Sequence, residues 1–379
     1  MEQVKRPAPV GSDREPLWGT YMHRKAAHLG IPFTGNFELT AKCNFNCRMC
    51  YVHDNTKPDA LSGEDWLGIA KEARDAGMVF VLLTGGEPFL HKDFKEIYTG
   101  MKRMGLLISI NSNGSLLTDE LISFFRKDPP LRFNITLYGG SNETYQSLCG
   151  RPAFDTVVGN IRKLREAGIQ VRVNATITPY NKDDIAAIYQ AGRDLDVPVK
   201  GTTYMFPPVR INGGRFGEAP HRFTPHEAAH YMLACREQFM SPEKLATLGD
   251  GALPPEADDC VDGSGEHVQC RAGRSTFWVT WDGRMLPCGM FPTDGYSIPQ
   301  MGFTEAWGKV RAYVESLTLP ASCTNCPQRA KCPVCAAATL CEEGDTTVRP
   351  AYICEMTREL HRITREKYCS EETQNHEND

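Results

Sequence analysis

Residues 40–51 of the 379-residue chain read Thr-Ala-Lys-Cys-Asn-Phe-Asn-Cys-Arg-Met-Cys-Tyr, with Cys43, Cys47 and Cys50 separated by three residues and then by two. Three thiolates on one short loop can hold three corners of a metal centre. Structural zinc sites close the shell with four protein ligands, whereas an iron–sulfur cube bound by three thiolates keeps one iron free for an outside ligand. The stretch therefore predicts a reactive metal centre, and the rest of the chain is interpreted around it.

The alternative is that the three cysteines pack as small hydrophobic residues. Their neighbours Lys42, Asn44, Asn46 and Arg48 are polar and show no core periodicity, so metal ligation is favoured. The spacing resembles that of the radical S-adenosylmethionine (radical SAM) superfamily, whose loop is Cys-x3-Cys-x2-Cys and whose free iron is chelated by the amino and carboxyl groups of SAM. Met49 stands where that family usually has an aromatic residue.

Length and composition favour a soluble globular protein of two units. Hydrophobic residues make up 41% of the chain and charged residues 23%, and no run of 18 or more apolar residues suggests a membrane span. The start lacks the apolar core of a secretory signal, so we expect a cytoplasmic protein, where fifteen cysteines favour metal over disulfides. A net charge of −5 gives no global basic surface for nucleic acid.

Extended apolar runs alternate with helical patterns from Asn36 onward, which indicates βα units and a parallel sheet. Ser62 is the expected N-cap of the first helix in this series. The strands are expected at 37–40, 79–84, 106–110, 132–137, 171–176 and 199–205, with helices at 63–76, 91–104, 117–126, 155–167 and 181–193. Six such units resemble the partial (β/α)6 TIM-type barrel of the radical SAM core, whose site lies at the carboxyl ends of the strands.

Three strand ends carry residues that the resemblance assigns to SAM. Gly85-Gly86-Glu87 resembles the family's Gly-Gly-Glu motif, which holds the SAM amino group, although by itself it is an ordinary turn. The next strand ends in Asn111-Ser112-Asn113-Gly114, where the family faces the ribose; Ser112 or Asn113 could bind its hydroxyls, and Asn113 is preferred.

The fourth strand end is similar to the family's Ser-x-Asp-Gly segment and the arginine that follows it. By that likeness Thr136 and Arg151 bind the SAM carboxylate, with a surface Arg as the alternative for Arg151. Tyr138 replaces the family's Asp, so the role of that acid does not transfer. Asn174 either reaches the cofactor or is a satisfied strand-end amide. Elsewhere, Cys149 and Cys235 are expected to pack in the core.

A second cysteine field begins at residue 260, with nine thiols within about a hundred residues. Two cubes with four cysteines each would use eight of them. A pair of zinc knuckles, Cys323-x2-Cys326 and Cys332-x2-Cys335, is the alternative, but only five residues separate the two knuckles.

The order of these cysteines resembles the SPASM extension of radical SAM enzymes, except that Cys332-x2-Cys335 is one residue shorter than usual. The likeness also places Cys288 on a hairpin, preceded by Gly283. It assigns the first auxiliary [4Fe-4S] cluster to Cys270, Cys288, Cys335 and Cys260, and the second to Cys323, Cys326, Cys332 and Cys354. Cys341 is either spare or competes with Cys354.

The predicted organisation is a lead-in segment (1–35), a radical SAM core (36–205), a bridge (206–259), a SPASM domain (260–357) and a C-terminal helix with a polar tail (358–379). The resemblance implies an oxidoreductase-type enzyme that cleaves SAM to a 5′-deoxyadenosyl radical, with a reductant such as flavodoxin or ferredoxin. A ribosomally made peptide is the first expected substrate class.

Three alternatives to peptide modification remain open. The short N-terminal segment shows no leader-binding domain, which favours a small-molecule substrate. Sulfatase-type maturation is less favoured, because Gly289 follows Cys288 where an Asp is expected. A non-enzymatic electron-transfer or zinc-binding scaffold would leave the Gly-Gly-Glu segment unexplained.

Overall fold

The computed structural model describes residues 17–52, 54–207, 221–250 and 270–369. Its central feature is a run of six parallel strands that follow one another in space as they do in the chain. The strands are β1 (Thr34–Glu38), β2 (Phe80–Thr84), β3 (Leu107–Ser112), β4 (Arg132–Thr136), β5 (Val171–Thr176) and β6 (Val199–Thr202). The predicted partial barrel is confirmed, with strand bounds that differ from the expected ones by a few residues.

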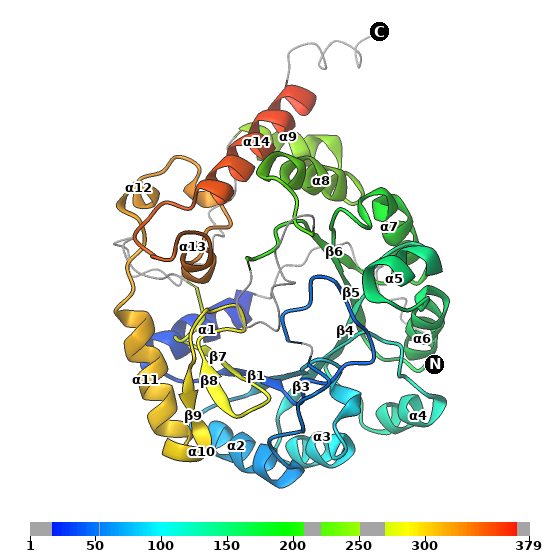
Figure 1. Ribbon diagram of the computed structural model, residues 1–379, viewed down its shortest axis with the longest axis vertical. Helices are drawn as coiled ribbons and strands as arrows, with labels where there is room; N and C mark the ends of the chain where they lie inside the picture. The colour runs from blue at the N-terminus through cyan, green and yellow to red at the C-terminus, as the bar shows by residue number, and fades with distance from the viewer. Residues whose placement is uncertain (1–16, 53, 208–220, 251–269, 370–379) are drawn as a thin grey trace.

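Helices cover the outer side of this curved sheet, as Figure 1 shows. Ser62 caps the first of them in a capping box with Asp65, as the sequence predicted. The connecting helices are α2 (Gly63–Asp75), α3 (Phe94–Arg103), α4 (Asp119–Lys127), α5 (Asn142–Cys149), α6 (Phe154–Glu166) and α7 (Ile185–Asp194). The sequence analysis missed α5, although Ser141 as N-cap and Gly150 in the left-handed conformation at its end are ordinary helix signals.

Aromatic side chains fill the core between the helices and the sheet. Phe125 of α4 is fully buried and lies edge-on to Phe133 of β4, with ring centroids 5.0 Å apart. Phe94 of α3 also meets the Phe125 ring, at 6.2 Å. This packing fixes the helices on the outer face and leaves the strand ends to form the site.

The C-terminal field continues the same sheet. Strand β7 (Thr276–Val279) pairs in parallel with β1, and β8 (Arg284–Leu286) and β9 (Tyr296–Ser297) follow in antiparallel order. The hairpin that carries Gly283 and is followed by Cys288 is therefore present as predicted, and it also extends the barrel sheet at its first strand. No local sequence pattern predicts the pairing of β7 with β1.

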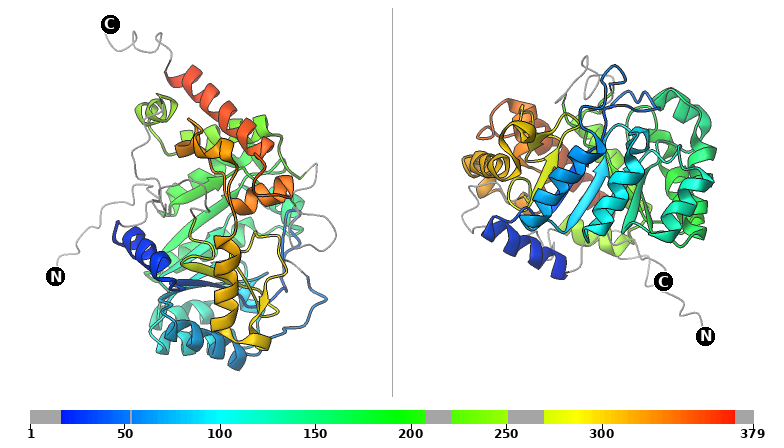
Figure 2. Two further views of the ribbon diagram at one scale, coloured as in Figure 1. Left: turned by 90° about the vertical axis from the view of Figure 1, so that its left-hand side faces the viewer. Right: turned by 90° about the horizontal axis from the view of Figure 1, so that it is seen from below.

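The remaining helices flank this extended sheet. Helix α14 packs against α8 and α9, and Figure 2 shows it from two further sides. It begins before the predicted boundary at residue 358. These helices are α1 (Leu17–Leu29), α8 (Pro225–Glu237), α9 (Pro242–Asp250), α10 (Ile298–Met301), α11 (Phe303–Glu315), α12 (Ala321–Thr324), α13 (Ala336–Glu343) and α14 (Ala351–Tyr368).

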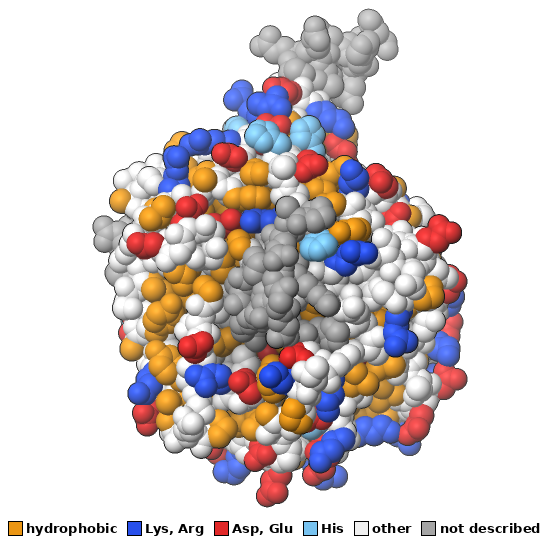
Figure 3. Space-filling view, viewed as in Figure 1, with side chains coloured by type: hydrophobic (Ala, Val, Ile, Leu, Met, Phe, Trp, Pro, Cys, Tyr) orange, Lys and Arg blue, Asp and Glu red, His pale blue; other side chains and the backbone are white. Residues whose placement is uncertain are grey.

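In the part of the chain that the structure describes, no helix is both long and apolar enough to cross a bilayer. Figure 3 shows Lys and Arg side chains mixed with Asp and Glu around the rim of one face, so neither sign dominates that rim.

Candidate metal and cofactor site

The cysteine loop follows β1 and is held by the end of α5. The backbone N–H of Asn46 donates to the carbonyl oxygen of Cys149 at 2.9 Å, and the N–H of Arg48 donates to that of Leu148 at 3.0 Å. The last carbonyls of a helix have no partner within the helix, so they are available to bind a neighbouring loop. The helix that the sequence analysis missed is thus the one that positions the loop.

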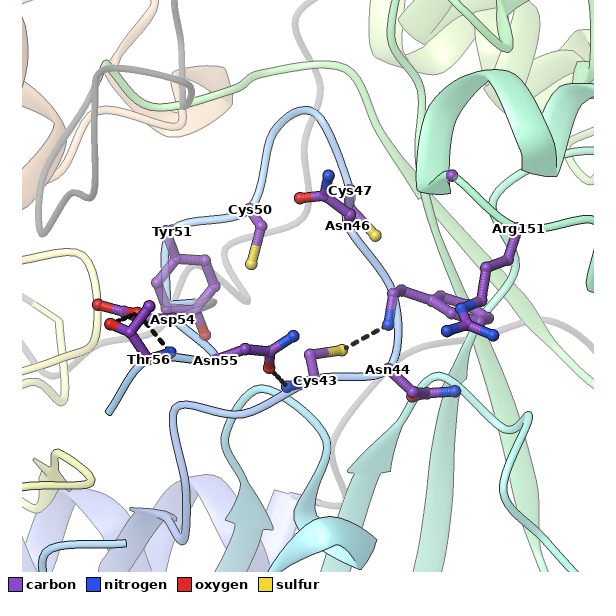
Figure 4. A pocket seen from close by; sticks show the side chains of 12 residues that line it. Cys43, Asn44, Asn46, Cys47, Cys50, Tyr51, Asp54, Asn55, Thr56 and Arg151 are labelled. Carbon is purple, nitrogen blue, oxygen red and sulfur yellow. Dashed lines mark hydrogen bonds between the residues drawn. The ribbon is translucent and has the colours of Figure 1, made fainter. Parts of the chain in front are cut away.

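The three thiols of the loop face a common space, as Figure 4 shows. Cys47 is buried, and Cys43 and Cys50 are partly buried. Burial is the main cause that raises the pKa of Cys43 above its ordinary value. A hydrogen bond with Cys149, followed by burial, raises the pKa of Cys47. Metal ligation needs the thiolate form, so binding a metal would release the protons of Cys43 and Cys47.

The donor set fits an iron–sulfur cube. The N–H of Phe45 points at the Cys43 sulfur from 3.4 Å, which is the kind of donor that stabilises a thiolate. Within the described residues, no three His, Cys, Asp or Glu side chains are grouped to hold a single metal ion. In a cube each thiolate binds its own iron atom, so three separated sulfurs around one space suit it.

The Gly-Gly-Glu turn after β2 packs directly under the cysteine loop. The N–H of Glu87 donates to the carbonyl oxygen of Lys42 at 2.8 Å. A Cβ atom at Gly85 would lie 2.6 Å from the carbonyl oxygen of Thr40, and Gly85 has a φ of +143°. Glycine is needed in this turn because the turn lies so close to the backbone of the cysteine loop.

A cavity of about 440 Å³ lies at the carboxyl ends of the strands, bounded by the cysteine loop. Each of β2 to β6 contributes a polar residue to it, and Thr136 and Asn174 are register partners on β4 and β5. Its lining includes Cys43, Cys47, Cys50, Thr84, Gly85, Gly86, Asn111, Ser112, Asn113, Thr136, Tyr138, Asn174, Thr176, Thr202, Tyr204, Met205, Phe206 and Met290. The cavity thus joins the three thiols to most of the residues predicted for SAM.

Arg151 lies on a second cavity, of about 640 Å³, which shares the three cysteines with the first. Its side chain is exposed, and Figure 4 shows it on the α5 side of the loop. Thr136 is not among the residues that line this second cavity. The two predicted carboxylate ligands therefore line different cavities, which share the three cysteines.

The positions of Glu87 and Asn113 differ from those expected for side chains in direct contact with SAM. Glu87 is fully buried and is not among the residues lining either cavity. Its carboxylate accepts from the hydroxyl of Ser112 and from the backbone N–H of Asn113, both at 2.9 Å. Burial raises the pKa of Glu87 to about 7. Asn113 lines the first cavity, but its amide is bonded to protein groups. This arrangement does not favour either predicted contact.

Cys149 and Cys235 are both buried, which confirms the prediction that they pack in the core. Cys149 in addition lies against Cys47, and its hydrogen bond is the largest cause of the raised pKa of Cys47. The sequence analysis missed this contact, because the signal for it was the unrecognised helix α5.

The described cysteines of the C-terminal field fall into two groups. Cys270 and Cys335 are near enough to add to the raised pKa of Cys288, which burial brings to about 12. After burial, Cys332 and Cys323 contribute to the raised pKa of Cys354, and Cys332 and Cys326 do so for Cys323. These groups match the two predicted ligand sets, apart from Cys260, which lies outside the described residues.

Cys341 belongs to the surroundings of the first group. Burial and then the nearby Cys335 raise its pKa to about 12. Its thiol donates to the carbonyl oxygen of Met290 at 3.5 Å. Cys354 instead lies on α14 beside the second group, so the two thiols do not occupy the same place.

Comparison with known proteins identifies the core. The model of the radical SAM superfamily matches residues 37–191. An AdoMet-dependent heme synthase from Methanosarcina barkeri is 23% identical over 332 residues, which cover 82% of this chain and 92% of the relative. A probable GTP 3′,8-cyclase from Saccharolobus islandicus is 34% identical over 163 residues, which cover 42% of this chain and 52% of the relative.

A solved structure with the same fold is Streptococcus suis SuiB bound to the precursor peptide SuiA. It has a TM-score of 0.66 and 16% identity, over 90% of this chain and 82% of that one. The matched segment 37–191 begins in β1 and contains the cysteine loop and the turn after β2. Residues 37–191 of this chain are therefore a radical SAM domain.

Proposed function

We propose that Cys43, Cys47 and Cys50 bind a [4Fe-4S] cube, that SAM binds beside it in the 440 Å³ cavity, and that the enzyme takes a hydrogen atom from a substrate in the same cavity. When bound, the reduced cube and SAM supply a 5′-deoxyadenosyl radical for that step. The observation that carries the proposal is that three thiols and polar residues at the ends of β2 to β6 line the same cavity.

The chain's own groups bind and orient SAM. Gly85 and Gly86 present backbone at the cavity wall, where the amino group would lie. Thr136 and Asn174 offer a hydroxyl and an amide on neighbouring strand ends, which suit a carboxylate or ribose hydroxyls. Arg151 lines the second cavity beside the same three cysteines and would add a guanidinium donor to the carboxylate.

Two auxiliary [4Fe-4S] clusters complete the proposal. The first takes Cys270, Cys288, Cys335 and Cys260, and the second takes Cys323, Cys326, Cys332 and Cys354. The nearness of the described members within each group supports this division. Because Met290 lines the cavity and follows Cys288 by two residues, the first auxiliary group lies next to the substrate space. It is therefore the one suited to accept an electron from substrate.

A ribosomally made peptide is the substrate class that we favour. Beyond the strand ends, the cavity is bounded by Tyr204, Phe206 and Met290, which suit a side chain of a peptide. Among the described residues, no charged side chain lines it. An uncharged polar lining suits peptide amides. SuiB, which shares the fold, has been solved with its precursor peptide.

A small-molecule substrate is the second candidate. The match to the AdoMet-dependent heme synthase covers 92% of that relative. A heme precursor carries carboxylates, which need cationic partners. The described lining offers none, so this candidate needs cations from parts of the chain outside the described residues.

The packing around Gly289 argues against sulfatase-type maturation. A Cβ atom at this position would lie 2.9 Å from the ring of Trp278. The Asp expected there in a sulfatase-maturing enzyme would therefore require the ring to move. Gly289 fits the packing of this hairpin better than an acid would.

The test replaces Cys43, Cys47 and Cys50 by Ala in the full chain and purifies it without oxygen. The variant should lose about four iron atoms per chain and all reductive formation of 5′-deoxyadenosine, while the C-terminal clusters remain. A variant that still forms 5′-deoxyadenosine would refute the assignment. Stimulation of the wild-type reaction by a candidate peptide, or instead by a heme precursor, decides between the two substrate classes.

A further inference from the structure

The side chain of Asn113 is fully engaged between β3 and the cysteine loop. Its amide nitrogen donates to the Asn44 side-chain oxygen at 2.8 Å and points at the Cys43 sulfur from 3.8 Å. Its amide oxygen accepts from the N–H of Ser115 at 2.9 Å and from the Ser115 hydroxyl at 2.7 Å. An amide has two N–H donors and one oxygen with two lone pairs, so no polar capacity remains for a ribose hydroxyl.

These contacts close a ring of hydrogen bonds. Asn113 donates to Asn44, Asn44 donates to the Ser115 hydroxyl at 2.8 Å, and that hydroxyl donates back to Asn113. A closed ring fixes the orientation of both amides, because turning either one would place donor against donor. It therefore keeps an N–H of Asn113, rather than its oxygen, on the side of Cys43.

Glu87 fixes the backbone of the same turn from beneath. Its two carboxylate oxygens accept from the Ser112 hydroxyl and from the backbone N–H of Asn113, both at 2.9 Å. The Ser112 hydroxyl in turn accepts from the N–H of Gly114 at 2.9 Å. Asn113 is 7% exposed and Glu87 is fully buried, so water does not compete strongly for these bonds. The turn cannot move without breaking buried hydrogen bonds to a carboxylate.

We propose that Asn113 is a positioning residue for the cube: it directs an N–H···S hydrogen bond at the Cys43 thiolate and thereby raises the reduction potential of the cube, with Glu87 holding it in place. Hydrogen bonds to cluster sulfurs stabilise the more negative, reduced state. The N–H of Phe45 is the second donor to the same sulfur, at 3.4 Å. This inference rests on the proposed binding of a cube by Cys43, and it assigns Asn113 to the cube instead of the ribose.

The test measures the midpoint potential of this cube without SAM, by EPR-monitored titration of the full chain with all its clusters. The signal is assigned by its loss in the Cys43, Cys47 and Cys50 triple variant. Asn113→Asp keeps the shape and the two acceptor contacts with Ser115, but replaces the N–H donor by a carboxylate oxygen. Asn113→Leu removes the donor without adding charge. Both should shift the potential to more negative values.

The matched control is Asn111→Asp, which adds the same charge in the same cavity. The Asn111 side-chain oxygen accepts from the Asn134 amide at 2.8 Å and is not bonded to a cysteine. The midpoint potential of the cube should shift less in Asn111→Asp than in Asn113→Asp. An equal shift would overturn the proposal, because it would reflect the general field of a carboxylate.

SAM affinity, measured by titration of the same variants, separates the two roles of Asn113. An unchanged SAM-free potential overturns the proposal, and weaker SAM binding in that case would return Asn113 to the ribose. Asn113→Asp keeps the test valid if Asn113→Leu does not fold. Failure of the proposed function itself would be recognised earlier, because the wild-type protein would then lack any EPR signal that depends on the three cysteines.

Discussion

The backbone N–H of Gly86 donates to the carbonyl oxygen of Thr40 at 2.8 Å, so the turn after β2 rests on the base of the cysteine loop. A side chain at position 86 would meet the backbone of Lys42 directly. Backbone cannot swing aside as a long side chain can. The same contact that joins the two motifs therefore also sets the position of Cys43.

We expect Gly86→Ala to displace the cysteine loop. The added methyl group should destabilise the protein by about 1–3 kcal/mol, as overpacking usually does, and should reduce loading of the N-terminal cube. Gly159→Ala is the control, because a Cβ there meets nothing within 4 Å and the residue lies inside helix α6. It should be neutral or stabilising by up to about 1 kcal/mol. Urea unfolding and iron analysis check both, and full iron content in Gly86→Ala would contradict the packing argument.

Repeating patterns made much of the fold predictable. Apolar runs bounded by turn residues identified β1 to β6, and the spacing of Cys43, Cys47 and Cys50 singled out the loop that bounds the strand-end cavity. The pairing of β7 with β1 was not predictable in the same way. Asn36 of β1 donates its side-chain amide to the carbonyl oxygen of Phe277 at 2.9 Å, across a separation of 241 residues. No local pattern encodes a partner at that distance.

The roles of single side chains in the site were less predictable for a related reason. Glu87 was identified by its motif, but the direction of its carboxylate depends on where β3 ends. The same holds for Asn113, whose amide is oriented by Asn44 and Ser115. A motif gives the type of residue at a strand end, whereas its hydrogen-bond partners are set by neighbouring strands and loops.

The buried Glu87 should make stability depend on pH. Burial raises its pKa from 4.5 to about 7 in the folded protein. Because the folded pKa is the higher one, the associated stability is fully present below pH 4.5 and is lost as pH rises through 7. A shift of this size corresponds to roughly 3 kcal/mol. Glu87→Gln cannot ionise, so the wild type should lose stability relative to this variant between pH 5 and pH 8.

Urea unfolding of the cluster-free wild type and Glu87→Gln at about pH 5 and pH 8 measures this difference in the free energy of unfolding. The contributions of other titrating groups cancel, because they are the same in both proteins. Glu120→Gln is the control. Glu120 is exposed, and a hydrogen bond from Lys95 lowers its pKa, so any change should have the opposite sign. If the Glu87 difference is the same at both pH values, the carboxylate keeps its charge in the folded protein.

A largely buried ion pair joins α13 to the segment before α8, with the Arg222 and Glu342 side chains 13% and 9% exposed. Arg222 pairs with Glu342, whose carboxylate also accepts from the Tyr204 hydroxyl at 2.8 Å. The guanidinium lies 3.7 Å from the centre of the Tyr352 ring. Arg222→Met should cost about 3–5 kcal/mol, because it leaves the Glu342 charge buried without its cation. The double variant with Glu342→Leu should recover much of this loss.

An exposed ion pair provides the comparison for that measurement. Lys95 and Glu120 are 2.6 Å apart, with side chains 52% and 80% exposed. Lys95→Met should change the free energy of unfolding by no more than about 1 kcal/mol. Equal effects of Lys95→Met and Arg222→Met on urea unfolding would mean that burial does not decide the value of the Arg222 pair.

The last prediction separates Cys354 from Cys341. Cys354 lies on α14 beside Cys332 and Cys323, two members of the second group. Cys341 lies near Cys335 of the first group, and its thiol already donates to the carbonyl oxygen of Met290 at 3.5 Å. We therefore expect Cys354→Ala to lower bound iron or to change the EPR spectrum of the second auxiliary cluster. Cys341→Ala should leave iron content and both auxiliary spectra unchanged.

Cys235→Ala controls for loss of a buried thiol outside the cysteine field, since Cys235 packs against Gly201 of β6. It should retain all iron. Loss of iron in Cys341→Ala together with full iron in Cys260→Ala would make Cys341 the fourth ligand of the first auxiliary cluster. That outcome differs from competition between Cys341 and Cys354 for the second auxiliary cluster. It would alter the first auxiliary cluster, which lies nearest Met290 and the substrate space. The spectrum that changes thus identifies which cluster each thiol serves.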